Sequence, residues 1–270
     1  MKALNLSSMA VLSILLFTVN GCKKDSKPTV DITKCKVISS TDNYGKEIYS
    51  YDSYGRITKL EYFDLFGASG GTRIYSYGYN RLYLSYSNSS QRDTVLLATS
   101  GLYVYFEGNS YINRCYINAA NQIDSITLGN SGIGTRILFA CKYNADGNLS
   151  EIKAFDQYKP WYTKTFTYGT EKNVMNYCPE SLFWTGGWGP SSIEDLKFQS
   201  KHFYGATISN LLPSSIHFQQ FDQNTGAPLG TGSTTNFSYT KDGDGKVTSI
   251  LEDYNNGTTN NLKLEYNCPQ

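Results

Sequence analysis

Residues that could carry out chemistry are few in this sequence. The two histidines, His202 and His217, form no motif with each other or with cysteine, so neither is expected to bind zinc or serve a hydrolase triad. Three carboxylates, Glu180, Glu194 and Asp195, could form a glycosidase pair only at a separation that the sequence does not define. We therefore expect no catalytic residue and no cofactor. An enzyme that processes glycans is the second alternative.

Two loops each contain part of a known ligand-binding motif, a calcium loop in one case and a phosphate-binding loop in the other. The Asp-Gly-Asp-Gly run at 242–245 has the paired carboxylates that begin a calcium loop, but Lys246 stands where a third oxygen ligand is expected. The glycine-containing stretch at 129–134 lacks the lysine and the following helix of a phosphate-binding loop. Both are predicted to be plain hairpin turns, and no metal site is predicted.

The strongest functional signal is aromatic. Trp161, Trp184 and Trp188 lie in loop-like sequence, and loops on a rigid sheet often carry binding residues. Flat aromatic faces beside Asn, Gln and Ser side chains suit sugar rings, so these three residues are the predicted ligand-binding set, with a glycan as one candidate ligand. In the structural alternative, Trp184 and Trp188 cover one end of the sheet as a hydrophobic lid.

The first 22 residues carry a targeting signal. Lys2 and the apolar stretch at 9–19 fit a secretory signal peptide, and the stretch is too short for a transmembrane helix, which needs about 20 residues. Val19 to Cys22 resembles a bacterial lipobox, so Cys22 is the predicted lipid-attachment site; an ordinary secretory signal with a chance cysteine is the alternative. We expect a signal peptide at 1–21, a lipidated cysteine and tether at 22–33, and a single antiparallel β domain at 34–270.

Composition narrows the class further. Without residues 1–21 the chain has 23 basic and 23 acidic side chains, so its charge gives no reason to bind nucleic acid. Its 23 Tyr, 13 Phe and 3 Trp supply ample surface to bury, which excludes a largely disordered chain.

Almost every segment after the leader has the pattern of a strand. Side chains alternate between the two faces of a strand, so Tyr75, Tyr77 and Tyr79 share one face. Similar patterns predict strands over 73–79, 82–86, 94–98, 102–106, 136–143, 163–168, 215–221 and 262–266. This density of short strands indicates an all-β fold, a curved or barrel-like antiparallel β-sheet built as a meander of hairpins. One exception, 191–203, is predicted to form a short helix.

A hairpin unit recurs along the chain. Residues 51–60 (YDSYGRITKL) match 143–152 (YNADGNLSEI) position by position, while 117–126 and 239–250 fit less closely, the last with a loop two residues longer. Asp or Asn begins each turn, and Gly or Asn takes the positive φ. Apolar residues three apart after the turn would fall on opposite faces of a regular strand. Either a bulge intervenes or both faces are partly covered.

Five cysteines follow Cys22, at positions 35, 115, 141, 178 and 268, in a compartment that permits disulfides. An odd number leaves at least one thiol unpaired, and the sequence does not decide among the pairings. A bridge between Cys35 and Cys268 would join the terminal strands. Cys115 and Cys141 flank an expected hairpin and are the second candidate pair.

Four features together resemble a family of Bacteroidota lipoproteins with a porin-like β fold. They are the lipobox, Cys35 before the first Tyr-Asp-x-x-Gly-Arg hairpin, the run at 202–216, and the closing Tyr-Asn-Cys at 266–268. The turns also resemble the YD-repeat hairpins of large bacterial surface and toxin-encapsulating proteins. The resemblance implies a curved or closed antiparallel sheet on a lipid tether, with no assigned activity. A membrane-spanning porin is not expected, because charged residues occur on both faces of several strands.

These observations predict a non-catalytic protein held by lipid in the cell envelope, at the outer membrane, that binds a ligand or partner. The partner is expected to be a glycan or an envelope protein. The alternative is a structural or assembly protein of the outer membrane, which the neutral charge and the hairpin-like repeats favour. The sequence leaves open which membrane face the protein occupies and whether the sheet closes.

Overall fold

The computed structural model describes residues 34–78, 81–87, 92–97, 102–107, 111–120, 122–130, 134–175, 177 and 209–268. The helix predicted at 191–203 lies outside these ranges, and so do Cys22, Trp184 and Trp188. Asp31–Gln270 forms one compact unit, which contains every described strand. We therefore expect this unit to fold without residues 1–30.

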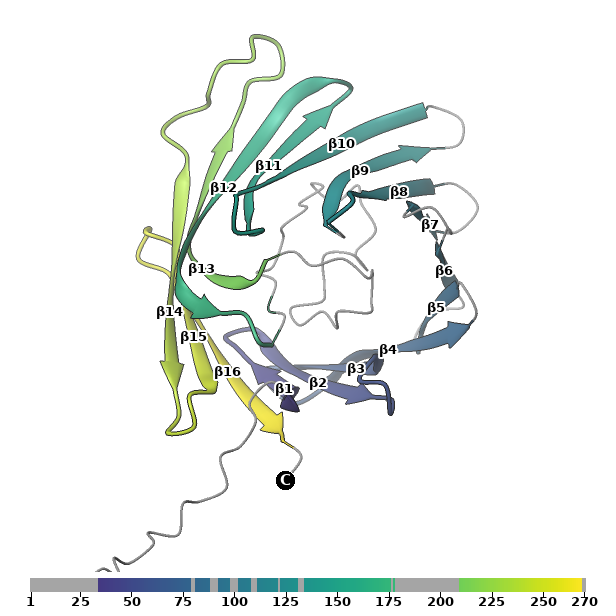
Figure 1. Ribbon diagram of the computed structural model, residues 1–270, viewed down its shortest axis with the longest axis vertical. Coiled ribbons are helices and arrows are strands. Elements are labelled where there is room, and N and C mark those ends of the chain that lie inside the picture. Colours follow the sequence, from purple (N-terminus) through teal and green to yellow (C-terminus); the bar gives the residue numbers. More distant parts are fainter. Residues whose placement is uncertain are drawn as a thin grey trace, which may run out of the picture. The chain divides into compact units, whose positions relative to one another are not determined.

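Sixteen strands occupy the described part of the chain, and each pairs antiparallel with its neighbours in sequence (Figure 1). They are β1 (Lys36–Thr41), β2 (Gly45–Tyr51), β3 (Ile57–Asp64), β4 (Ser69–Gly78), β5 (Arg81–Tyr86), β6 (Arg92–Leu97), β7 (Leu102–Glu107), β8 (Tyr111–Ile117), β9 (Ile123–Asn130), β10 (Gly134–Tyr143), β11 (Leu149–Asp156), β12 (Lys159–Lys172), β13 (Leu211–Gln220), β14 (Ser233–Lys241), β15 (Val247–Asp253) and β16 (Thr259–Asn267). The predicted all-β meander is confirmed, and each of the eight strands predicted from the pattern is present.

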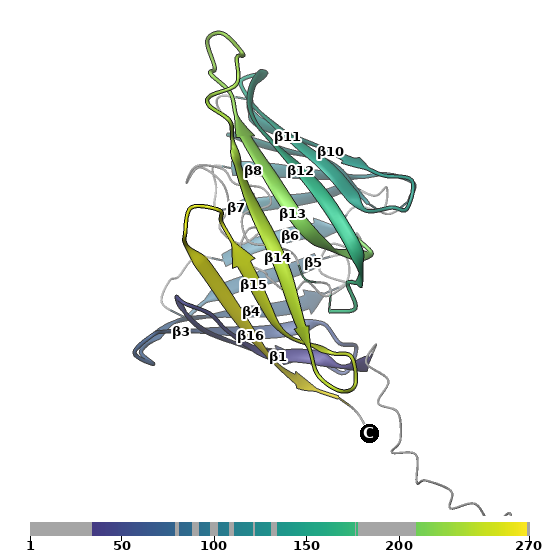
Figure 2. The same ribbon diagram turned by 90° about the vertical axis from the view of Figure 1, so that its left-hand side faces the viewer.

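The ladder between β1 and β16 closes the sheet into a barrel, running from Lys36 opposite Asn267 to Thr41 opposite Lys263. Closure leaves no strand edge with unpaired backbone groups. We call the end at which β1 begins and β16 ends the entry end, and the opposite end the far rim. The β14–β15 turn and the C terminus lie at the entry end, and the long β13–β14 hairpin projects at the far rim (Figure 2).

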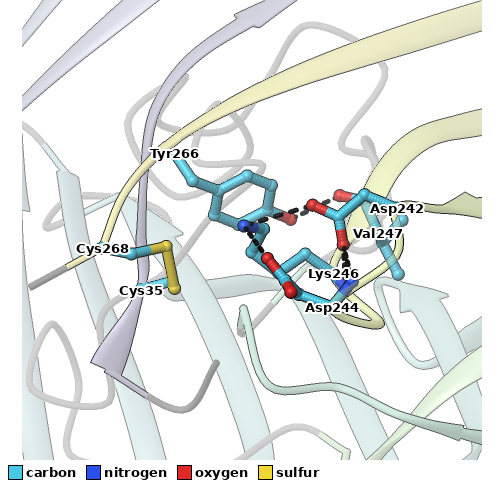
Figure 3. The surroundings of a disulfide bond; sticks show 7 residues. All are labelled: Cys35, Asp242, Asp244, Lys246, Val247, Tyr266 and Cys268. Atoms are coloured by element: carbon cyan, nitrogen blue, oxygen red, sulfur yellow. Dashed lines mark hydrogen bonds and ion pairs between the residues drawn. A yellow bond between two sulfur atoms is a disulfide. The ribbon is translucent and has the colours of Figure 1, made fainter. Parts of the chain in front are cut away.

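A disulfide between Cys35 and Cys268 staples this seam at the entry end (Figure 3). Beside it, the Tyr266 hydroxyl donates a hydrogen bond of 2.7 Å to the Val247 carbonyl, which ties β16 to β15. The disulfide joins residues 233 positions apart, so it holds together the two ends of the barrel unit.

The second candidate pair does not fit the strand register. Cys115 lies on β8 opposite Ile126 of β9, whereas Cys141 lies on β10 opposite Ile152 of β11. The whole of β9 separates the two cysteines, or about 9–10 Å between strand axes, where a disulfide needs Cα atoms within about 7 Å. The prediction of a Cys115–Cys141 bridge is not compatible with this register. The sequence suggested a hairpin between them, but two turns intervene.

The described interior of the barrel is largely apolar. In β16, the buried Leu262 and Leu264 alternate with the exposed Asn261, Lys263 and Glu265. One buried cluster joins residues of β1 to β5 with residues of β13 to β16, so the apolar faces meet inside the barrel. A membrane-spanning barrel has the reverse arrangement, with apolar residues outside. The outward-facing residues of β16 are polar, unlike those of a lipid-facing strand.

The repeated hairpins share a turn and a bulge. Asp52 Oδ1 accepts hydrogen bonds from the backbone N–H groups of Tyr54 and Arg56, each at 2.9 Å, and Gly55 takes φ of 79°. Register shifts follow the corresponding turns in β2–β3, β8–β9, β10–β11 and β14–β15. Because of this bulge, Ile57 and Leu60 are both buried, which decides between the two explanations that the sequence left open. The unit at 239–250 has the same turn and not a longer one, because Lys241 faces Val247 as Tyr51 faces Ile57.

A tyrosine side chain forms a hydrogen bond to the backbone at each of five bulges, two of which lie outside the recognised repeats. In each case the hydroxyl donates to the carbonyl of the residue that begins the bulge on the preceding strand, at 2.6–2.8 Å. The pairs are Tyr51 with Val37, Tyr77 with Ile57, Tyr168 with Leu149, Tyr239 with Pro213, and Tyr266 with Val247. Burial raises the pKa of Tyr51, Tyr77, Tyr239 and Tyr266 well above the usual value for tyrosine.

These tyrosines predict loss of stability at alkaline pH. Their pKa values are raised in the folded state, so their contribution is complete below the unfolded pKa of about 10 and declines above it, by up to about 1.4 kcal/mol per pH unit for each tyrosine. Urea unfolding between pH 9 and pH 11.5 should show this decline, with a shallower slope for Tyr239→Phe. The control Tyr158→Phe, at a side chain that is 80 % exposed, should keep the wild-type slope. Equal slopes for wild type and Tyr239→Phe would contradict the assignment.

Candidate functional site

Large apolar side chains project from the turns of the far rim. Phe66 in the β3–β4 turn is 94 % exposed and Tyr158 in the β11–β12 turn is 80 % exposed, and both stand in short turns. Tyr44 and Leu65 are also exposed at this rim, and so is Leu229 in the β13–β14 hairpin. Tyr44, Leu65 and Phe66 lie in the two turns on either side of the β2–β3 ladder, and exposed apolar groups close to one another commonly mark an interaction site.

The entry end differs in the turns that the structure describes there. The residues between the Asp or Asn and the Gly or Asn of each repeat are mostly Ser, Ala, Gly and Asp. Tyr54 is the one large exposed aromatic side chain among these described turns. Among the turns that the structure describes, those of the far rim therefore carry the larger exposed apolar side chains, and this rim lies opposite the point where the chain enters β1.

A groove opens on the outer face beside this rim, over the first three strands. Its volume is about 390 Å³ and its lining is mostly apolar. The lining residues are Thr41, Gly45, Lys46, Ile48, Phe63, Asp64, Leu65 and Gly67. The sequence analysis missed this site. The available signal was Leu65 and Phe66, which stand in an Asp-x-x-Gly turn at positions that hold small or polar residues in most of the repeats.

A buried carboxylate organises the barrel interior. Glu252 on β15 is buried and accepts hydrogen bonds from the hydroxyls of Tyr177 at 2.6 Å and Tyr254 at 2.8 Å, and from Asn260 Nδ2 at 3.0 Å. Tyr177 follows the end of β12, and it packs with Met175 in the buried cluster. Three donors satisfy the carboxylate, as buried charges require. Glu252 therefore anchors the chain that leaves β12 inside the barrel.

The return to β13 is held by a turn of the repeat. Asn148 Oδ1 accepts hydrogen bonds from the backbone N–H groups of Asn210 and Leu211, at 2.9 and 3.0 Å. Ser209 Oγ accepts from the Leu149 N–H at 3.0 Å. Asn148 occupies the same position in its repeat as Arg56 in the first repeat. Arg56 forms an ion pair with Asp52 of the same turn. The side chain at this repeat position thus binds either a residue of its own turn, as in Arg56, or the backbone that leads into β13, as in Asn148.

Of the three tryptophans, only Trp161 lies in the described part of the chain. It is half-buried at a register shift in β12 and packs edge-on against Tyr162, with ring centroids 5.4 Å apart. The ring is part of the packing around the second buried cluster. The ligand-binding role of Trp161 stays a prediction, and Trp184 and Trp188 lie outside the described residues.

The DGDG run forms the β14–β15 turn. Lys246 Nζ lies 3.1 Å from Asp242 Oδ2 and 3.4 Å from Asp244 Oδ2, so an ammonium stands between the two carboxylates. Burial opposes ionisation of Asp242, but the amide and ammonium of Lys246 outweigh it and lower the pKa of the carboxyl. No group of three or more potential metal ligands occurs among the described residues. His217 Nδ1 lies 3.0 Å from Thr234 Oγ1, as expected for a structural histidine.

These features define a closed antiparallel barrel with a largely apolar interior and with large exposed apolar side chains in the described turns of the far rim. No protein-family model and no curated protein matches the sequence. In the described part of the chain, no helix is long and apolar enough to cross a membrane.

Solved structures with the same fold come from Bacteroides. A porin-like protein from Bacteroides uniformis aligns with a TM-score of 0.61 at 17% identity, covering 86% of this chain and 98% of the other. A porin-like protein from Bacteroides vulgatus aligns with a TM-score of 0.54 at 15% identity, over 86% of this chain and 98% of the other. At these identities the likeness establishes the fold, which agrees with the porin-like β fold that the resemblance implied.

Proposed function

We propose that this chain is a non-catalytic protein of the cell envelope, held by lipid on Cys22, whose barrel presents a binding surface at the far rim. The observation that carries the proposal is the contrast between the described turns at the two ends of the barrel. Large exposed apolar side chains occupy the far rim, and the chain enters at the other end. A tether at 22–33 would hold the entry end toward a membrane and leave the rim accessible. The porin-like fold of the Bacteroides proteins supports an envelope location.

The anchor is tested separately from the binding surface. Cys22→Ser should abolish metabolic labelling by a fatty acid and shift the protein out of the detergent-soluble membrane fraction. Cys141→Ser, a matched change of another cysteine, should leave both properties as in wild type. Continued labelling of the Cys22→Ser chain would contradict lipid attachment at this residue.

Site-specific photocrosslinking in whole cells tests the rim. A photoreactive side chain at position 66 should give a discrete adduct, because Phe66 projects from the rim and is almost fully exposed. The matched control is position 54, which is also an exposed aromatic in a hairpin turn, but at the entry end. Adducts of equal yield from both positions, or none from position 66, would overturn the proposed surface. An adduct with the mass of two chains would favour the assembly role that the sequence leaves as an alternative.

A further inference from the structure

The groove at the far rim places cations next to an apolar floor. In one row across four strands, Phe63 lies opposite Lys46, Lys46 opposite Thr41, and Thr41 opposite Lys263. Side chains alternate along a strand, so Lys46 and Ile48 point away from the buried Tyr49 and onto the outer face. The Lys46 ammonium group and the Thr41 hydroxyl thus adjoin the apolar lining of Ile48, Phe63 and Leu65. Lys263 lies opposite Thr41, next to this lining and not in it.

The carboxylates near this row are engaged with other groups. Asp64 Oδ1 accepts the backbone N–H groups of Phe66 and Ala68, each at 2.9 Å, and so belongs to its turn. Glu265 accepts a hydrogen bond from the Ser39 hydroxyl, and its Oε2 lies 3.7 Å from Lys46 Nζ. These two contacts hold the pKa of Glu265 below its usual value. At 3.7 Å the ion pair is loose and exposed, and such pairs contribute little. An incoming anion can therefore compete for Lys46.

On the neighbouring strand, Glu61 lies opposite Ile48 and carries its own counter-ion. Its Oε1 is 2.8 Å from Lys59 Nζ on the same strand. Glu61 thus has Lys59 as its counter-ion, and Asp64 is bonded by backbone N–H groups. Lys46, whose contact with Glu265 is loose, stands at one end of the apolar surface. The groove volume of about 390 Å³ lies within the roughly 300–1,000 Å³ typical of small-molecule sites.

We infer that this groove binds a single-chain amphiphile with an anionic head group, the hydrocarbon chain lying on Ile48, Phe63 and Leu65 and the head group beside Lys46. The inference rests on the proposed ligand-binding function and names its ligand class. Apolar burial supplies the affinity and a charge-assisted hydrogen bond from Lys46 supplies the preference for an anion.

Octyl phosphate, octanol and octyltrimethylammonium share one tail and differ in the head, and each is titrated into residues 31–270 below its micelle concentration. Binding is measured by calorimetry and by the shift in melting temperature. We expect saturable binding of octyl phosphate, with octanol about tenfold weaker and the ammonium compound weaker still. Lys46→Gln should abolish the difference between octyl phosphate and octanol. Leu65→Ser should weaken both by about threefold to tenfold.

The control is Leu251→Ser, the same substitution at an exposed leucine on the outer face of β15, where it should leave binding unchanged. Absence of saturable octyl phosphate binding would overturn the inference, and so would equal binding of inorganic phosphate or wild-type affinity in the Lys46→Gln and Leu65→Ser variants. Photocrosslinks from position 66 are independent of these titrations. If the crosslinks persist while the titrations fail, the far rim binds a partner and the amphiphile assignment alone is wrong.

Discussion

Replacing both Cys35 and Cys268 by Ala is expected to lower the free energy of unfolding by about 5 kcal/mol. The disulfide closes a loop with a sequence separation of 233 residues. In the chain-entropy model, a loop of about 100 residues already gives about 4.7 kcal/mol, and the effect grows slowly with length. For a unit of this size the melting temperature should fall by roughly 10–20 °C. Urea unfolding of residues 31–270 under oxidising conditions measures the loss.

Reduction supplies the control. Dithiothreitol should lower the stability of the wild-type unit by a similar amount and have little effect on the double variant, because no seam disulfide remains there to reduce. At the far rim, a hydrogen bond from Asn43 Nδ2 to the Thr259 carbonyl, at 2.6 Å, still joins the β1–β2 turn to β16 in the double variant. The variant should therefore stay folded at 25 °C. A loss below about 1 kcal/mol would show that the β1–β16 ladder closes the barrel without help from the covalent bond.

Replacing Glu252 by Ala is expected to cost about 3–5 kcal/mol. The substitution leaves the donors of Tyr177, Tyr254 and Asn260 inside the barrel without their acceptor, and each such group costs about 1–3 kcal/mol. Glu252→Gln keeps an acceptor oxygen and should lose about half as much. Chemical denaturation of the variants tests this order.

A matched pair of tyrosine variants separates the anchoring role of Glu252 from its contribution to stability. Tyr177→Phe and Tyr254→Phe each remove one hydroxyl from the same carboxylate, at about 1.5–3 kcal/mol. Tyr177 belongs to the segment after β12, where its N–H donates to Asn173 Oδ1 at 2.7 Å. Hydrogen exchange at this amide should therefore accelerate in Tyr177→Phe and not in Tyr254→Phe. Equal acceleration in both would show that the segment is not held through Glu252.

Local patterns in the sequence predicted much of the fold. Alternation over 73–79 and 262–266 places β4 and β16, because a strand that buries one face must alternate. The turns at Asp52 and Asn144 form as predicted, because an Asx side chain bonds the backbone two and four residues on. Such signals lie within a few residues of each other and need no knowledge of the rest of the chain.

The candidate site could not be predicted in the same way. The groove combines Thr41, Lys46 and Phe63 from three strands, and their adjacency depends on register. Glu252 and Tyr177 meet only because the chain after β12 enters the barrel. Trp161, one of the three tryptophans predicted to bind a ligand, packs against Tyr162. A residue type alone does not show whether a side chain faces a ligand or a neighbour.

By itself the sequence determined an all-β antiparallel meander with recurring Asx turns, because these features depend on the local backbone preferences of the residues that form them. The pairing of β1 with β16 and the placement of Cys115 and Cys141 on non-neighbouring strands became visible in the three-dimensional structure alone. Closure and register depend on contacts between residues far apart in the sequence, such as Lys36 and Asn267, which are 231 positions apart. The free energy of those contacts is shared over the whole sheet, so no single segment of sequence encodes it.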